Sequence, residues 1–258
     1  MKYPNLEKLV DIIAVLRSEN GCPWDREQTH KSLRPNMLEE AYEAVDAIDD
    51  GDISNLKEEL GDVLLQVVLH SQIAKDNGEF DIEDVAQELS EKLIHRHPHV
   101  FGSAHVESSD DVVTNWDKLK KEEKTYRKSI LDGIPKAQSA LMSAQKISKK
   151  VVKVGFEWEN IESLKECIQS EYKEFEEAVK IGDKDKMEDE MGDIFFATVN
   201  LARWYKIDAE QALITANNKF IKRFQKMEEL KTKPFEDYTF EEFNELWKQA
   251  KLKINEEK

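Results

Sequence analysis

The fold is decided by a sequence pattern that occurs twice, first as EEAYEAVDAIDDGD (39–52) with EELGDVLLQVVLH (58–70) and again as SEYKEFEEAVKIGD (170–183) with DEMGDIFFATVNL (189–201). The glutamates, the turn glycine and the Gly-Asp pair match at a constant offset of 131 residues, as Glu40 and Glu171 illustrate. In each copy, apolar residues recur at helical spacing on both sides of the turn glycine. Each copy therefore predicts two antiparallel helices with a short turn, and the chain is predicted to hold duplicated helical domains.

The rest of the chain also favours an all-α fold. Only 9 Gly and 6 Pro occur in 258 residues, which is little punctuation for a β-rich or loop-rich protein. We find no convincing strand, and we expect a turn-rich segment over 21–30 and a loop over 98–110. The predicted domains are 1–105 and 130–258, with a helical linker over 106–129. Helical periodicity predicts helices over 4–18, 36–50, 54–76, 81–96, 111–128, 136–153, 160–181, 184–205, 208–230 and 239–256.

Composition excludes several classes of function. The 38 Lys and Arg against 54 Asp and Glu give a net charge of −16, which argues against nucleic acid as a partner but not against an anionic substrate held through metal ions. No stretch is long and apolar enough for a membrane span, and the first twenty residues lack the apolar core of a signal peptide. Two cysteines are too few for a disulfide scaffold, so we expect free thiols in the reducing cytoplasm.

Acidic residues of the repeat are candidate metal ligands. Residues three apart lie on one face of a helix, and the short turns bring the two helices of each copy together. Four converging carboxylates repel one another unless a hard divalent cation, Mg²⁺ or possibly Mn²⁺, neutralises them. The set in the second half is Glu171, Glu174, Glu190 and Asp193; the possible second site in the first half is Glu40, Glu43, Glu59 and Asp62.

Ordinary solvated helix faces are the alternative explanation for these carboxylates. Two features favour a site. Asp62 and Asp193 each precede an apolar run, where an unpaired charge is costly. Gly61 and Gly192 lie inside helices, where glycine costs about 1 kcal/mol relative to alanine, and we expect a close backbone approach there.

Basic and aromatic residues of the second half could hold a polyphosphate nucleotide. Lys186 precedes Glu190 by one helical turn, and Lys219 and Arg223 are one turn apart on a later helix. Cations opposite a metal site suit a polyphosphate, and Trp247 could stack on a base. An intrahelical Lys186–Glu190 pair, surface charges and a packed tryptophan remain the alternatives.

Seven sequence blocks stand out along the chain: CPWDREQTH (22–30), LEEAYE (38–43), EELGDVLLQV (58–67), RHPHVFG (96–102), VGFEW (154–158), EMGDIFFATVNLAR (190–203) and the NKF-x-x-RF run (218–224). Together they resemble the MazG family of nucleoside triphosphate pyrophosphohydrolases in its two-domain bacterial form. The resemblance implies dimeric helical bundles, Mg²⁺ dependence, and hydrolysis of NTPs and dNTPs to the monophosphate and pyrophosphate. It implies that the second domain is catalytic, with the four carboxylates named above as metal ligands. It also implies that Lys186, Lys219, Arg223 and Trp247 contact the nucleotide.

The chain departs from the family pattern at two positions. Ser170 replaces the first of two consecutive glutamates, and Cys167 replaces an upstream lysine, whereas the first half keeps Glu39 and Glu40. The two halves are therefore expected to differ in their share of catalysis.

Two other functions remain open on the residues alone. A di-iron bundle needs Glu-x-x-His motifs on two helices, but the second half contains no histidine. A regulatory or scaffolding helical module, with one or both sites silent, is the main alternative; Lys92 and Arg96 echo Lys219 and Arg223 weakly. Because a two-helix hairpin cannot bury both its faces alone, each half is expected to pair with a second copy, giving a homodimer. Protein partners are not readable from the sequence.

Overall fold

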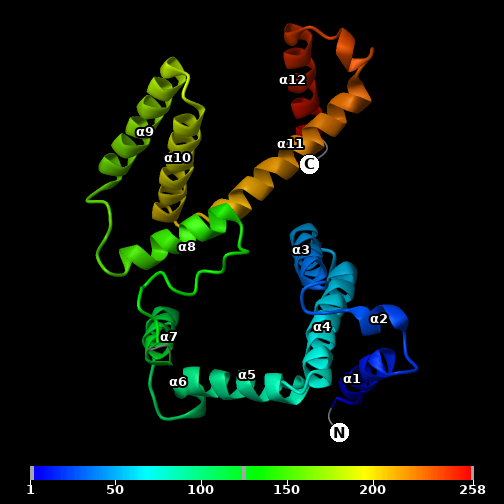
Figure 1. Ribbon diagram of the computed structural model, residues 1–258. Coiled ribbons are helices and arrows are strands. Elements are labelled where there is room, and N and C mark those ends of the chain that lie inside the picture. The colour runs from blue at the N-terminus through cyan, green and yellow to red at the C-terminus, as the bar shows by residue number, and fades with distance from the viewer. Residues whose placement is uncertain (1–2, 124–125, 257–258) are drawn as a thin grey trace. The chain divides into compact units, whose positions relative to one another are not determined.

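The computed structural model describes residues 3–123 and 126–256, and every regular element in these ranges is helical (Figure 1). The all-α prediction is confirmed for them. The chain divides into two compact units, residues 1–124 and 125–258, which are described separately. The boundaries predicted for a linker over 106–129 stay a prediction. No helix in the described ranges is long and apolar enough to cross a membrane.

The first unit is built around a hairpin of two long helices, α3 (Arg34–Asp50) and α4 (Ile53–Asp76). The helix α1 packs on α4, and α7 contacts α5. Its core is a cluster of apolar side chains that includes Ile13 from α1, Leu33 and Val68. The helices are α1 (Pro4–Arg17), α2 (Pro23–Glu27), α3 (Arg34–Asp50), α4 (Ile53–Asp76), α5 (Ile82–Arg96), α6 (Pro98–Phe101) and α7 (Ser109–Glu123).

The second unit repeats the hairpin with α9 (Ile161–Ile181) and α10 (Lys184–Trp204). It adds a two-helix arm, which consists of α11 (Ala209–Leu230) and α12 (Phe240–Glu256). The helix α8 packs on α10 and α11, whereas α12 lies alongside α11 (Figure 1). Among the described helices, α9 contacts α10 alone and α12 contacts α11 alone. The helices are α8 (Ala140–Val152), α9 (Ile161–Ile181), α10 (Lys184–Trp204), α11 (Ala209–Leu230) and α12 (Phe240–Glu256), with a short 3₁₀ helix at Phe235–Asp237 before α12.

The Gly-Asp turn makes both hairpins. Gly51 and Gly182 end α3 and α9 in the left-handed backbone region, at φ of 69° and 78°, where a side chain would be strained. The aspartate that follows caps the next helix: Asp52 accepts backbone N–H groups of the first turn of α4, and Asp183 accepts the N–H of Lys186. The repeated turn therefore fixes the antiparallel geometry that was predicted.

Four local expectations need correction. The segment 21–30 contains α2, and the predicted loop over 98–110 starts with α6, because a proline fits the first position of a short helix in each. The helix predicted over 111–128 starts earlier, at Ser109. A Cβ added at Gly61 or Gly192 meets no heavy atom within 4 Å apart from the backbone of its own helix, so the expected close backbone approach does not occur among the described residues.

Candidate metal centre and adjoining cavity

Three carboxylates of the second unit converge between α9 and α10. Oxygens of Glu171, Glu190 and Asp193 lie within 4.8 Å of one another. The pair on α10 is three residues apart and so shares a face, and the antiparallel packing brings α9 opposite that face. Glu174, the fourth predicted ligand, lies outside this group, but its charge acts on Glu190.

The environment of Glu190 disfavours its negative charge. The side chain is only 8% exposed. Burial raises the pKa of Glu190 above its ordinary value, the charges of Glu174 and Glu171 raise it further, and Lys186 offsets part of the increase. A cation bound among these carboxylates would remove this repulsion.

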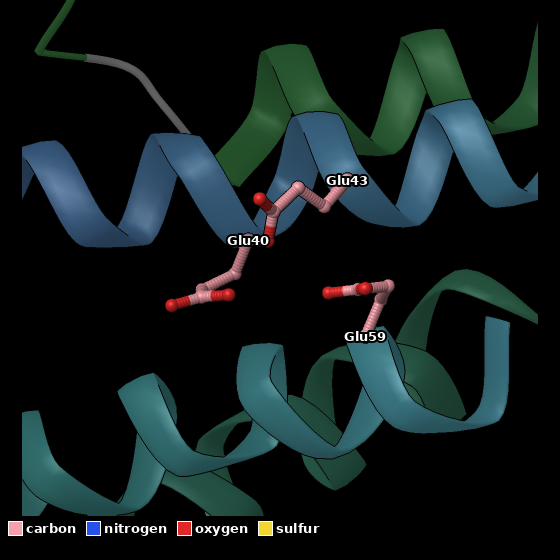
Figure 2. Close-up of side chains that lie close together, drawn as sticks. All are labelled: Glu40, Glu43 and Glu59. Carbon is pink, nitrogen blue, oxygen red and sulfur yellow. The ribbon is translucent and has the colours of Figure 1, made fainter. Parts of the chain in front are cut away.

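The first unit holds a similar group at the equivalent place. Oxygens of Glu40, Glu43 and Glu59 lie within 4.8 Å of one another, and Figure 2 shows these side chains pointing into the space between α3 and α4. Burial raises the pKa of Glu40, with further increases from Asp62 and Glu43. Burial also raises the pKa of Glu59, again with contributions from Glu43 and Asp62. Asp62 thus acts on the group electrostatically without belonging to the closest three.

A largely apolar cavity of about 490 Å³ adjoins the carboxylates of the second unit. Two of the three carboxylates, Glu171 and Asp193, belong to its lining, so the group lies at its edge. The other lining residues are Ile147, Val151, Phe156, Glu157, Trp158, Cys167, Phe196, Ala197 and Asn200. The cavity can take an aromatic, weakly polar group beside a bound cation.

A second, more open depression of about 750 Å³ adjoins this cavity at Asp193. Its lining is acidic apart from Lys186 and Gly192, and it follows the first turns of α10. Asp193 belongs to both linings, so the carboxylate group separates an apolar cavity from a polar, solvent-open one. This arrangement suits a ligand with an apolar end and a charged end.

The two hairpins lie in stretches of sequence that match a known protein family. Residues 28–101 and 159–227 both match the MazG nucleotide pyrophosphohydrolase domain. The chain belongs to the MazG family. This is a family of hydrolases, and the double match shows that its domain occurs in tandem.

Relatives support the MazG assignment along the whole chain. A nucleoside triphosphate pyrophosphohydrolase/pyrophosphatase MazG from Thermotoga maritima is 46% identical, over 95% of this chain and 95% of its own. A nucleoside triphosphate pyrophosphohydrolase from Escherichia coli is 42% identical, over 95% and 97%. An uncharacterized protein, YabN, from Bacillus subtilis is 46% identical over 96% of this chain and 52% of its own length.

Both departures from the MazG pattern contact carboxylates. The thiol of Cys167 donates to Oε1 of Glu171, and the hydroxyl of Ser170 donates to Oε1 of Glu174, each at 3.4 Å. Burial raises the pKa of the Cys167 thiol to about 11, with additional increases from the hydrogen bond to Glu171 and nearby carboxylate charges. Cys167 is therefore a neutral thiol that donates to a predicted ligand.

The predicted nucleotide contacts of the MazG pattern divide into two groups. Lys186 lines the polar depression and acts on Glu190. In the arm, by contrast, the Arg223 guanidinium lies 5.6 Å from the Trp247 ring centre, and Phe220 packs 5.2 Å from the same ring. Lys219 lies on α11 near them. Neither the carboxylate group nor the lining of either cavity includes Lys219, Arg223 or Trp247 among the described residues.

Most side chains that line the cavity were not singled out as site residues from the sequence, and Trp158 and Asn200 are two of them. Trp158 lies inside the VGFEW block, whose resemblance to the MazG family was noted without a role. Asn200 follows Asp193 by two helical turns and is a polar residue in a mostly apolar run, which was a usable signal. The Asn200 side chain accepts from the Ser148 hydroxyl at 2.6 Å and donates to the Phe196 carbonyl at 2.9 Å.

The histidines of the first unit do not enter a metal group among the described residues. His30 and His70 stack, with their Nδ1 atoms 2.7 Å apart, and His97 bonds the Leu93 carbonyl as a turn residue. Arg96, the weak counterpart of Arg223, is held by Glu123. The first unit thus differs from the second in its histidines and in the ion pair of Arg96.

Proposed function

We propose that the chain is a Mg²⁺-dependent nucleoside triphosphate pyrophosphohydrolase that cleaves NTPs and dNTPs to the monophosphate and pyrophosphate in the cytoplasm. The observation that carries the proposal is the convergence of Glu171, Glu190 and Asp193 at the edge of an apolar cavity. The names of the relatives support the reaction. We place the catalysis in the second unit, and Glu174, whose charge acts on Glu190, completes the proposed ligand set.

The donor set fits Mg²⁺ or Mn²⁺. All members of the group are carboxylates, which hard divalent cations prefer, and neither histidine nor thiolate is among them. The repulsion that raises the pKa of Glu190 is relieved when a cation binds. When bound, the metal would supply charge neutralisation for both the carboxylates and the substrate phosphates.

The two cavities define the orientation in which we propose that the substrate binds. The nucleoside would enter the apolar cavity beside Trp158 and Asn200, and the phosphates would extend past Asp193 towards Lys186. A carboxylate of the group would orient the attacking water, and attack at the α-phosphorus releases pyrophosphate. Lys186 would offset charge on the departing group.

A second copy of the chain would complete the site. Large apolar side chains remain exposed on the α9–α10 hairpin and on α11, including Tyr172, Phe195 and Phe220. Groups of exposed large apolar side chains such as these mark association surfaces. In the proposed homodimer, the arm of one copy would bring Lys219 and Arg223 to the phosphates, and Trp247 to the base, of the nucleotide held by the other.

The alternative function is a regulatory or scaffolding module in which one or both carboxylate sites are silent. The first unit is the candidate for such a silent site. Gln66 stands where the second unit has Ala197 in the cavity lining, at the repeat offset of 131. Its side chain is 5% exposed, and Oε1 has no hydrogen-bond partner among the described residues. A buried amide at the position of a cavity wall favours a different role for this unit.

Substitution of equivalent aspartates tests the assignment. Asp193→Asn removes a proposed ligand without removing volume, so pyrophosphate release from NTPs with Mg²⁺ should be lost while the helical circular dichroism is retained. Asp62→Asn, the matched change in the first unit, should leave most of the hydrolysis. Loss of activity in the Asp62 variant with retention in the Asp193 variant would assign catalysis to the first unit instead.

A further inference from the structure

One wall of the cavity in the second unit belongs to no helix. Residues 153–160 connect α8 to α9, and Phe156, Glu157 and Trp158 in this connection line the cavity. The backbone fixes its two ends: the N–H of Phe156 donates to a carbonyl of α8, and the side chain of Asn160 caps α9. The middle, which carries Trp158, depends on a side-chain contact.

Glu157 makes that contact. Its Oε1 accepts a hydrogen bond from Nη2 of Arg203 at 2.6 Å and another from the backbone N–H of Trp158 at 2.9 Å. Arg203 lies on α10, one turn after Asn200, which also lines the cavity. A single carboxylate oxygen therefore ties the wall to the helix that carries Glu190 and Asp193.

The pair is largely withdrawn from water. The Arg203 side chain is 11% exposed and that of Glu157 is 27% exposed. Burial raises the pKa of Glu157, but the hydrogen bonds from Arg203 and from the Trp158 N–H, with the charge of Arg203, outweigh it and hold the pKa below its ordinary value. Loss of either partner would leave a part-buried charge without its counter-ion, so the wall would be expected to move.

We propose that Arg203 and Glu157 are positioning residues that hold Trp158 against the nucleoside part of the substrate. The inference rests on the proposed function, because it takes the apolar cavity as the nucleoside site. Arg203 follows Asp193 by ten residues, or about 15 Å along the helix. The pair therefore sets affinity for the nucleoside and leaves the carboxylates and the bound phosphates unaffected.

The test measures the binding of the nucleoside and the binding of the phosphates separately. With the full chain and Mg²⁺, KM and kcat are measured for each NTP, and inorganic tripolyphosphate, which lacks a nucleoside, is measured as a competitive inhibitor. Arg203→Met should raise the KM for NTPs by roughly tenfold, the effect of losing one charge-assisted hydrogen bond, with kcat and the tripolyphosphate inhibition constant unchanged. Arg203→Lys, which keeps a charged donor, should restore part of the affinity.

Two further variants keep the test decisive. Glu157→Gln retains the size of the side chain and should raise KM in the same selective way if Arg203→Met fails to fold. Lys253→Met is the matched control, because it removes an ion pair with Glu256, 2.9 Å long, on α12 and outside the cavity lining. Its KM should equal that of the unmodified chain.

The outcomes separate the two proposals. An unchanged KM in both the Met and Gln variants overturns the positioning role. An equal rise in KM and in the tripolyphosphate inhibition constant also overturns it, since the pair would then support the whole site. If the unmodified chain hydrolyses no NTP, the proposed function itself is wrong.

Discussion

Asn200 lines the cavity and is held by a hydrogen bond from Ser148. The contribution of this bond to stability can be tested by removing one atom, the hydroxyl oxygen of Ser148. Ser148 is 1% exposed and Asn200 7% exposed, and the Ser148 hydroxyl lies 2.6 Å from Oδ1 of Asn200. The orientation of the amide is fixed by its second contact, because the Phe196 carbonyl accepts and so must face Nδ2. Ser148→Ala leaves Oδ1 buried without this donor.

The expected cost follows from that burial. An unsatisfied buried acceptor lowers the free energy of unfolding by about 1–3 kcal/mol. For a unit of this size, the melting temperature of the second unit should fall by roughly 3–10 °C. The double variant Ser148→Ala/Asn200→Leu removes both polar partners and should recover most of the loss.

The assay is urea unfolding of the full chain followed by circular dichroism, with the KM for NTPs measured in parallel. Ser90→Ala is the control, because the Ser90 hydroxyl is exposed and bonds only a carbonyl of its own helix in the described structure. That variant should stay within about 0.5 kcal/mol of the unmodified protein. If the free energy of unfolding of Ser148→Ala also stays within this range, or if the double variant is the least stable of all, the bond does not hold Asn200 in the cavity lining.

Three further outcomes are expected. Excess chelator should abolish NTP hydrolysis, and Mg²⁺ or Mn²⁺ should restore it better than Zn²⁺; full activity in chelator would contradict the carboxylate site. Burial and the charges of neighbouring carboxylates raise the folded-state pKa of Glu190 above 4.5, so its contribution to stability falls as pH rises through the interval from 4.5 to that pKa. Glu190→Gln should therefore raise the melting temperature of the metal-free protein at neutral pH and leave it unchanged below pH 4.5; a lower melting temperature at neutral pH would refute the sign. Sedimentation at micromolar concentration should give twice the 30.0 kDa of one chain, and a mass near 30.0 kDa would contradict the homodimer.

Local spacing was enough to predict both hairpins. Glu190 and Asp193 are three residues apart, so helical geometry alone places them on one face. Gly182 and Asp183 end one helix and cap the next by interactions within a few residues. The same local logic failed at Gly192, because the reason for a helical glycine lies in what approaches it, and nothing within the described chain does.

The sequence by itself therefore determined the helices, the duplication and the approximate place of two carboxylate groups, all of which depend on short-range geometry. Only the tertiary structure decided what surrounds them. Arg203 reaches Glu157, in the connection that follows α8, across 46 residues, and Ser148 reaches Asn200 across 52 through the packing of α8 on α10. Local spacing encodes neither contact. Likewise, only the tertiary structure shows that Trp247 packs against Arg223 and Phe220 of α11 and is not part of the cavity lining beside the carboxylates.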